Sequence, residues 1–312
     1  MLIRRLIFCD IFQNDDDRHS LKISDITIMR VLIIGANGML GNTLLRYFAA
    51  KESFQVIASV RNTRSLCNMA DAPNHQLITG VDAENLDDLR LVFDEAKPDM
   101  VVNCVGIVKQ LAAAEDALVS IPLNSLLPHR LASLCAENGS RLIHFSTDCV
   151  FSGKKGNYLE SDVPDATDLY GRSKLLGEVD YPHAITLRTS LIGHELHSAR
   201  SLLNWFLAQE GSVKGFTKAI FSGLPTVEIA RVIEEHVLPH PDLHGVYHLS
   251  VDPISKYDLL SIVEDVYGKK IEIIPDDSLV IDRTLDSTRF REATGFVPKP
   301  WSELVQAMYD FG

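Results

Sequence analysis

Residues 30–41 read RVLIIGANGMLG, and this stretch decides the class of fold. The apolar run 31–34 predicts a buried strand, because continuous apolar runs are typical of strands covered on both faces. Gly35, Gly38 and Gly41 follow at three-residue spacing, before the helical stretch NTLLRYFAA at 42–50. Such a turn lets a pyrophosphate approach the free N–H groups and the positive end of the helix. We therefore expect a bound dinucleotide here; a tight turn without a ligand is the alternative.

Strands and helices alternate along the chain up to about residue 193. Further apolar runs predict strands at 54–60, 76–80, 100–106, 141–147 and 184–193. Stretches with helical character lie between most of them, at 85–96, 125–139 and 169–179. Parallel strands buried on both faces need helical crossovers between them. The order therefore predicts an α/β fold with a doubly wound parallel sheet of the Rossmann type.

The rhythm changes after residue 193, where helical stretches at 198–211, 227–239 and 254–268 dominate. We expect a smaller, mostly helical C-terminal lobe that binds substrate, made of residues 194–223 and 251–312. Residues 29–193 would form the nucleotide-binding domain, with returning elements around 224–250. Residues 1–28 do not continue the strand–helix pattern, and we interpret them as a poorly packed extension derived from an upstream start codon.

Composition and charge argue against several classes of function. The chain has 42 acidic and 30 basic residues and a net charge of −12, which argues against a nucleic-acid-binding surface. No apolar run approaches the ~20 residues that span a bilayer, so we expect a cytoplasmic protein without membrane contact. The five cysteines form no CxxC pair and the histidines lack zinc-ligand spacing, so no metal site is expected.

The end of the second predicted strand indicates which dinucleotide is bound. It reads ASVRNTRS at 58–65 and contains no acidic residue that could accept a hydrogen bond from a ribose 2′-OH. The guanidinium of Arg61 or Arg64 can instead bind a 2′-phosphate, so NADPH is expected; solvated loop charges are the alternative. Asp82 is a candidate acceptor for the adenine amino group or a helix cap. The pyrophosphate would lie against Gly35, Asn37, Gly38, Met39 and Leu40.

Two Tyr-x-x-x-Lys pairs compete for a catalytic role, Tyr47 with Lys51 and Tyr170 with Lys174. The first pair lies well along the helix after the glycine turn, where packing is the expected role. The second pair follows the strand 141–147, which delivers Thr147 to the carboxyl edge of the sheet, where ligands bind in doubly wound folds. On a helix Tyr170 and Lys174 share a face, and the ammonium is expected to favour the phenolate. The second pair is the predicted catalytic one.

Six segments, in order, resemble the extended short-chain dehydrogenase/reductases: GANGMLG, FSTDCVFSGKKGNYLESD, YGRSK, LRTSLIG, GLPT and LDSTRF. The resemblance covers about residues 29–312 and is strongest to the dTDP-4-dehydrorhamnose reductase branch. It implies NADPH-dependent reduction of the 4-keto group of a nucleotide-diphospho-4-keto-6-deoxy sugar, in glycan precursor biosynthesis. It also implies a catalytic triad of Thr147, Tyr170 and Lys174.

The resemblance assigns further residues to the site. Asn103, Val105 and Gly106 would lie beside the nicotinamide ribose, and Asn124 would support a proton relay; packing is the alternative for both segments. The implied substrate contacts are Asp148, Cys149, Arg188, Ser190 and Leu191. The family usually has Tyr where Cys149 stands and Trp where Leu191 stands, so the exact sugar stays open. These smaller side chains favour a sugar with a bulkier C2 substituent, such as an acetamido group.

Two other functions stay open beside the reductase. An epimerase of the same fold would keep NAD(H) bound and is expected to have an acid at the end of the second strand. A non-catalytic NADP-binding regulatory subunit would retain the fold but tends to lose the Tyr or the Lys, and this chain has both. The expected partner is the sugar-nucleotide substrate, and a homodimer is an open option for assembly.

Overall fold

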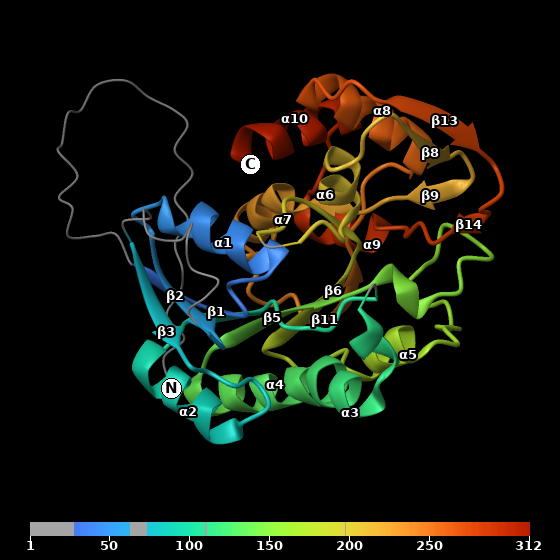
Figure 1. Ribbon diagram of the computed structural model, residues 1–312. Helices are drawn as coiled ribbons and strands as arrows, with labels where there is room; N and C mark the ends of the chain where they lie inside the picture. Colours follow the sequence, from blue (N-terminus) through green and yellow to red (C-terminus); the bar gives the residue numbers. More distant parts are fainter. Residues whose placement is uncertain (1–27, 63–73, 110, 197) are drawn as a thin grey trace, which may run out of the picture.

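The computed structural model describes residues 28–62, 74–109, 111–196 and 198–312. The predicted extension, apart from Ile28, and Arg64 lie outside these residues. In the described part, seven parallel strands form the main sheet (Figure 1). Their order is β11 (Gly245–His248), β6 (Ala184–Arg188), β5 (Arg141–Ser146), β4 (Met100–Asn103), β1 (Met29–Ile34), β2 (Phe54–Val60) and β3 (His75–Thr79).

Helices cover both faces of this sheet, as the buried apolar strands require. Figure 1 shows α1 and α7 on one side and α2, α3, α4 and α5 on the other. The first side carries a core with Phe48 and Ile229 at its centre, and the second a core with Phe93 and Leu131. The bounds are α1 (Met39–Ala49), α2 (Leu86–Ala96), α3 (Ala117–Ser120), α4 (Leu127–Asn138), α5 (Leu169–Leu176) and α7 (Thr226–Val232). The doubly wound prediction is confirmed.

The chain after residue 190 contains more strand than the sequence predicted. Short sheets pair β7 (Leu191–Ile192) with β10 (Leu224–Pro225) and β8 (Ser212–Phe216) with β13 (Glu272–Asp276). A third sheet has β9 (Ala219–Phe221) between β12 (Ile254–Ser255) and β14 (Ile281–Asp282). The remaining helices are α6 (Leu202–Leu207), α8 (Lys256–Tyr267), α9 (Thr288–Thr294) and α10 (Trp301–Phe311). Strands of two to five residues carry too little periodicity to be recognised in a sequence.

One predicted helix of this region is shorter than expected, and a second has the expected length but an irregular end. The helix predicted at 198–211 is reduced to α6, because β8 begins at Ser212, directly after Gly211 with a φ of +74°. The helix predicted at 227–239 continues α7 as the π-helical turn η6 (Ile233–Val237). Among the described residues, no helix has the length and apolarity that would take it across a bilayer. The division into a nucleotide-binding domain and a substrate lobe stays a prediction.

The order of the strands fixes where a site can form. The chain moves outward from β1 to β3 and then returns to β4 on the other side of β1. In a doubly wound sheet, ligands bind at the carboxyl edge where the strand order reverses in this way. The register places Ile34, Asn103 and His144 in one row close to that edge. The loops after β1, β4 and β5 therefore start side by side.

Candidate active site

At two of the three glycines in the turn after β1, the protein's own packing leaves no room for a side chain. Gly35 has a φ of +85°, and a Cβ there would lie 2.7 Å from the Val105 side chain. A Cβ on Gly41 would lie 2.3 Å from the carbonyl oxygen of Gly35, which is backbone and cannot move aside cheaply. Gly35 thus permits the turn against the β4 loop, and Gly41 lets α1 pack against β1.

Gly38 has no such reason to be glycine. Its φ is −79°, and a Cβ there would meet only the carbonyl oxygens of Gly35 and Cys104, at 3.5 and 4.0 Å. It is also the N-cap residue of α1, and no side chain caps the helix there. Glycine therefore leaves open the space beside the start of α1 that a Cβ would occupy. A pyrophosphate fits this arrangement, because a helix N-terminus attracts anions and glycine admits them closely.

The loop after β4 is fixed by two buried polar side chains. Asn103 Oδ1 accepts a hydrogen bond from Val105 N at 3.1 Å, and its amide nitrogen lies 3.2 Å from His144 Nδ1. Burial lowers the pKa of His144 well below its usual value, and the nearby Lys174 acts in the same direction, so the ring is neutral. Asn103 therefore positions the backbone of the loop at Val105, and its own side chain is buried.

Asn124 connects this loop to α5, the helix that carries the predicted catalytic pair. It lies in the π-helical turn η4 (Ile121–Leu126) and is fully buried. Its Oδ1 accepts from Ile107 N at 2.9 Å, and its Nδ2 donates to Ser173 Oγ at 3.1 Å. Pro128 has no N–H, so the Asn124 carbonyl cannot receive the usual α-helical hydrogen bond. The proline explains why the helix is irregular at this point.

The backbone of the segment after β5 lies in close contact with the backbone at the start of α5. Thr147 caps the 3₁₀ turn η5 (Asp148–Val150) by accepting from Cys149 N at 3.1 Å, and its hydroxyl donates to Asp148 Oδ1. A Cβ on Gly171 would lie 2.4 Å from the carbonyl oxygen of Cys149, so only glycine allows this approach. Asp168 caps α5 by accepting from Gly171 N at 2.9 Å. Tyr170, between these two residues, is thereby brought to Thr147.

Burial raises the pKa of the Tyr170 phenol, and nearby Cys149 and acidic side chains act in the same direction. A hydrogen bond with Thr147 opposes this rise. The sequence expectation that Lys174 favours the phenolate is wrong for this structure, because desolvation of the phenol dominates. A phenol that stays protonated is suited to donate a proton, which a carbonyl reduction requires.

Lys174 is buried beneath the site, with 7% of its surface exposed. Its ammonium donates to the carbonyl oxygen of Phe145 at 2.6 Å. Burial lowers the pKa of Lys174 to about 8, and the nearby Glu178 acts in the opposite direction. A Cβ on Gly106 would lie 3.9 Å from Lys174 Nζ and 3.3 Å from Asn124 Oδ1. The ammonium therefore lies beside the β4 loop, where a nicotinamide ribose is expected.

The rival pair, Tyr47 and Lys51, has a structural role. Tyr47 OH donates to Glu234 Oε2 at 2.7 Å, and Lys51 forms an ion pair with the same carboxylate. Burial and the hydrogen bond to Glu234 raise the pKa of Tyr47. Glu234 belongs to η6, so this cluster joins α1 to the helix that continues α7. The structure therefore separates the two pairs as predicted, one at the carboxyl edge of the sheet and one on its flank.

Arg188 and Glu178 form a buried ion pair. Arg188 Nη2 lies 2.7 Å from Glu178 Oε2, and its Nη1 lies 3.2 Å from His248 Nε2. Ser146 Oγ also donates to Glu178, at 2.7 Å. A buried carboxylate needs such partners, so the guanidinium is engaged by the protein's own groups. The structure thus gives Arg188 a role in positioning β6, and its expected contact with substrate is not what this geometry offers.

The other expected substrate contacts lie around the junction of sheet and lobe. The Ser190 carbonyl accepts from Leu224 N at 2.9 Å, and Leu191 pairs with Leu224 and packs partly into the core. Burial and the charge of Asp148 raise the pKa of the Cys149 thiol to about 12, so it is not a reactive thiolate. Asp148 lies between Thr147 and Cys149, at the first position of η5.

Arg61 and Asp82 lie away from this cluster, on the β2–β3 side of the sheet. Arg61 is exposed directly after β2, where a 2′-phosphate is expected. Asp82 is exposed too, and its carboxylate accepts from Glu84 N at 3.0 Å. Asn85, and not Asp82, is the N-cap of α2. The capping alternative for Asp82 is therefore wrong, and a role toward adenine stays a prediction.

Several residues of the cluster were missed from the sequence. Asp168 had a usable signal, because an Asp two residues before Tyr170 is a typical N-cap. Gly171, directly after Tyr170, also indicates a close approach. Ser173, Glu178 and His144 gave no signal, because their roles depend on partners far away in the chain.

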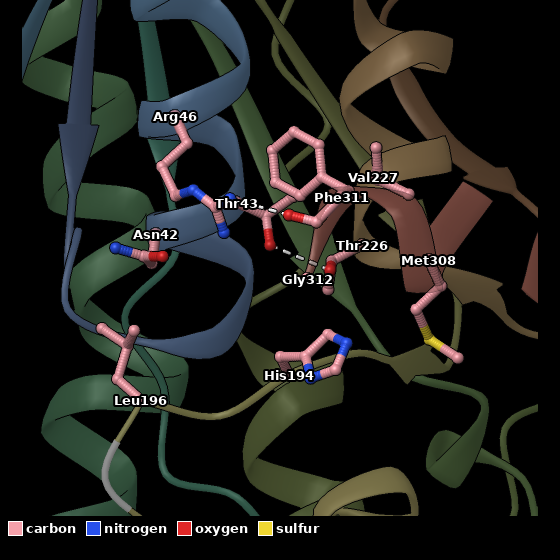
Figure 2. Close-up of a pocket in the computed structure, with 10 residues that line it drawn as sticks. All are labelled: Asn42, Thr43, Arg46, His194, Leu196, Thr226, Val227, Met308, Phe311 and Gly312. Carbon is pink, nitrogen blue, oxygen red and sulfur yellow. Dashed lines mark hydrogen bonds between the residues drawn. The ribbon is translucent and has the colours of Figure 1, made fainter. Parts of the chain in front are cut away.

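A separate pocket opens where α1 meets the C-terminal lobe, and Figure 2 shows its lining. Thr43 of α1 and Thr226 of α7 share a hydrogen bond of 2.9 Å across it. The Arg46 guanidinium donates to the Phe311 carbonyl and stacks on the ring of Phe311. None of the predicted triad residues lines this pocket, so it is distinct from the cluster around Tyr170.

Known proteins resemble the chain in sequence and in fold. The sequence model of the RmlD substrate binding domain matches residues 29–311. The probable low-salt glycan biosynthesis reductase Agl14 of Haloferax volcanii is 32% identical, over 82% of this chain and 84% of its own. Methionine adenosyltransferase 2 subunit beta of Danio rerio is 28% identical, over 77% and 74%. The structure of dTDP-4-dehydrorhamnose reductase from Bacillus anthracis in complex with NADP superimposes with a TM-score of 0.71 at 20% identity, covering 91% of this chain and 98% of that one.

Replacing each tyrosine by phenylalanine separates the two Tyr–Lys pairs. Tyr170→Phe is expected to lower turnover in the predicted reductase reaction by roughly 10²–10⁴-fold, the usual contribution of a positioned acid. Tyr47→Phe is expected to keep turnover and to lose about 1 kcal/mol of unfolding free energy with its hydrogen bond to Glu234. Steady-state kinetics and urea denaturation measure the two effects. The reverse pattern, with Tyr47→Phe inactive and Tyr170→Phe active, would overturn the assignment.

Gly38 and Gly41 offer a matched pair of alanine substitutions. Gly38→Ala is expected to change the melting temperature little and to weaken NADPH binding at least tenfold, about 1.4 kcal/mol. Gly41→Ala is expected to cost about 1–3 kcal/mol of unfolding free energy, because its Cβ would be forced onto backbone. Thermal melts without nucleotide and a fluorescence titration with NADPH distinguish the two. Unchanged NADPH affinity in Gly38→Ala would show that no phosphate lies there.

Proposed function

The chain belongs to the extended short-chain dehydrogenase/reductases, in the family of the RmlD substrate binding domain, and on this basis we propose that it is an NADPH-dependent sugar-nucleotide reductase. The proposed reaction reduces the 4-keto group of a nucleotide-diphospho-4-keto-6-deoxy sugar. The observation that carries this proposal is the meeting of Thr147, Tyr170 and Lys174 beside the β4 loop, at the carboxyl edge of the sheet.

Each residue of the triad has a role that follows from its surroundings. Tyr170 donates the proton to the keto oxygen, because its raised pKa keeps it protonated. The Thr147 hydroxyl holds the same oxygen and orients it toward the phenol. Lys174, beside Gly106, binds the nicotinamide ribose, while Asn124 keeps the β4 loop and α5 in register. NADPH, bound at the glycine turn, supplies the hydride.

The choice of NADPH is supported by the end of β2. Arg61 is exposed there, and the described residues after the strand offer no carboxylate in the place where NAD-binding proteins carry one. A guanidinium binds a phosphate bidentately, whereas a carboxylate would repel it. A role in glycan precursor synthesis is supported by the name of the Haloferax relative, a glycan biosynthesis reductase. The cytoplasmic location and the homodimer stay predictions.

A regulatory subunit is the second candidate, because the relative from Danio rerio is named a subunit of methionine adenosyltransferase. Against it stands the intact cluster of Thr147, Tyr170 and Lys174, which a purely structural subunit does not need. An epimerase of the same fold is less well supported, because an acid at the end of β2 is missing. The three candidate functions differ in the number of NADPH molecules oxidised per sugar converted, and so one assay separates them.

The assay supplies 4-keto-6-deoxy sugar nucleotides with NADPH and follows absorbance and product. A reductase is expected to oxidise one NADPH per sugar, since each reduction consumes one hydride. The panel includes the dTDP-linked unsubstituted sugar and a UDP-linked 2-acetamido sugar; Cys149 and Leu191 predict a preference for the second. Conversion of sugar without net oxidation would indicate an epimerase, and a regulatory subunit would show no chemistry on any member of the panel.

Cofactor preference tests the role of Arg61. The unmodified protein is expected to use NADPH with a higher kcat/KM than NADH. Arg61→Ala is expected to reduce this preference by about 1.5–3 kcal/mol, the usual value of a hydrogen bond to a charged group. Kinetics with both cofactors measure it, and Arg289→Ala in α9 is a control for loss of a surface charge. Equal use of NADH by the unmodified protein would contradict the proposal.

A further inference from the structure

The pocket of Figure 2 lies beside the helix that begins at the glycine turn, and the proposed reaction does not use it. Its lining comes from α1, from α7, from the loop after β7 and from the end of α10. Its volume is about 350 Å³, part of which is open to solvent. Sites for small molecules usually begin at about this size. The pocket is therefore large enough for a small ligand, and none of the residues predicted for cofactor or substrate lines it.

Arg46 brings a positive charge to this pocket. Figure 2 shows its side chain reaching from α1 toward Phe311. Arg46 Nη2 donates to the Phe311 carbonyl oxygen at 2.7 Å, and the guanidinium carbon lies 4.5 Å from the centre of the Phe311 ring. No carboxylate side chain lines the pocket, and none of the ion pairs among the described residues includes Arg46. The guanidinium is thus held in place while it keeps N–H donors for an anion.

The histidine in the lining adds no charge of its own. His194 Nε2 lies 2.9 Å from the hydroxyl oxygen of Tyr267. Burial lowers the pKa of His194, and the charge of Arg46 acts in the same direction. The imidazole is therefore neutral at pH 7, and Arg46 carries the charge of the side chains that line the pocket.

Asn42 lies one helical turn before Arg46, on the same side of α1. Its side chain is buried, with 4% of its surface exposed, and its amide nitrogen has no hydrogen-bond partner among the described residues. A buried amide without a partner costs free energy, and such groups in folded proteins are usually satisfied. The terminal amide turns easily about its last bond, so this donor can face a ligand in the pocket. An acceptor placed beside Arg46 would satisfy it.

The opposite wall of the pocket is mostly apolar. Its side chains are those of Leu196, Val227, Met308 and Phe311. The two hydroxyl groups of the lining are already engaged, because Thr43 donates to the Met39 carbonyl at 3.0 Å and shares a hydrogen bond of 2.9 Å with Thr226. A ligand for this pocket therefore needs an anionic end for α1 and an apolar body for the other wall.

We propose that this pocket binds a small organic carboxylate, with its carboxylate against Arg46 and Asn42 and its body against the apolar wall. The two oxygens of a carboxylate match the planar fork of a guanidinium and can also accept from an amide. A neutral ligand would leave the charge of Arg46 unpaired, and an inorganic anion would leave the apolar wall in contact with water. This inference goes beyond the proposed function, since it involves neither the sugar nucleotide nor the catalytic cluster.

The pocket shares residues with the start of the cofactor helix. A Cβ on Gly193 would lie 2.5 Å from Thr226 Oγ1 and 3.3 Å from Met39 Sδ, so the loop that carries His194 packs against the first residue of α1. Met39 directly follows Gly38, where we expect the pyrophosphate. A ligand that contacts this loop, α1 and α7 is expected to change the affinity for NADPH. By linkage, NADPH changes the affinity for that ligand by the same factor.

Three probe molecules test the chemical class of the ligand. Ligand-observed NMR titrations measure the binding of benzoate, benzamide and inorganic phosphate to the unmodified chain. Benzoate carries both the carboxylate and an apolar ring, so it is expected to bind saturably. Benzamide keeps the shape without the charge, and phosphate keeps a charge without the apolar body. Each is expected to bind at least tenfold more weakly than benzoate.

Arg46→Gln is expected to weaken benzoate binding at least tenfold, because it removes the charge-assisted hydrogen bonds. Arg289→Gln is the matched control: Arg289 Nη1 donates to the Val246 carbonyl at 3.0 Å, and its guanidinium lies 4.3 Å from the centre of the Tyr247 ring. It removes the same charge from similar surroundings and is expected to keep benzoate affinity within twofold. Val227→Phe is expected to fill the apolar side and to abolish binding. Thermal melts show which variants are folded, and Val227→Phe carries the test if Arg46→Gln is not.

The outcomes are independent of the reductase reaction. Saturable benzoate binding that Arg46→Gln and Val227→Phe lose and Arg289→Gln keeps supports the site, whether or not the chain reduces sugar nucleotides. No saturable binding of benzoate, or binding that survives both pocket variants, overturns the site and leaves the proposed reaction standing. Repeating the benzoate titration on protein saturated with NADPH measures the linkage, and an unchanged affinity would show that the link to the cofactor is wrong.

Discussion

Lys174 donates its buried ammonium to the carbonyl oxygen of Phe145, and the catalytic edge of the protein depends on this hydrogen bond of 2.6 Å. This hydrogen bond joins α5 to the end of β5. It therefore fixes the position of Tyr170, on α5, relative to Thr147, which directly follows β5. Because an ammonium loses much of its hydration when buried, it needs such an acceptor, and the cost is visible in a pKa lowered to about 8. The same ammonium lies beside Gly106, where cofactor and catalytic helix would meet.

Small residues bring the backbones close enough for this arrangement. Gly35, Gly41 and Gly171 each stand where a Cβ would collide with neighbouring atoms within 3 Å. Gly38 is different, because the protein leaves space around it. The first three glycines are explained by the packing of the protein's own atoms, and Gly38 is not. Geometry thus separates the glycines that packing requires from the one that we propose for cofactor binding, which the spacing of the motif cannot do.

The sequence was a good guide to the sheet and a partial guide to the site. Continuous apolar runs such as 31–34 predicted the parallel strands, and the position of Tyr170 after β5 distinguished it from Tyr47. What could not be predicted depends on distant partners. Arg188 pairs with Glu178, and burial rather than Lys174 governs the phenol of Tyr170. The short strands of the lobe were not predicted, because they are defined by their pairing and not by a periodic sequence pattern.

The central claim is that one carbonyl group receives a hydride from NADPH and a proton from Tyr170. The most direct measurement follows deuterium from NADPH labelled at C4 of the nicotinamide into the sugar, by mass spectrometry and NMR. The account predicts that each reduced sugar carries one deuterium at C4, delivered from one face of the nicotinamide. Tyr170→Phe is expected to form this labelled sugar only at the rate of its residual turnover. A sugar that is converted while all deuterium stays on the cofactor would contradict it.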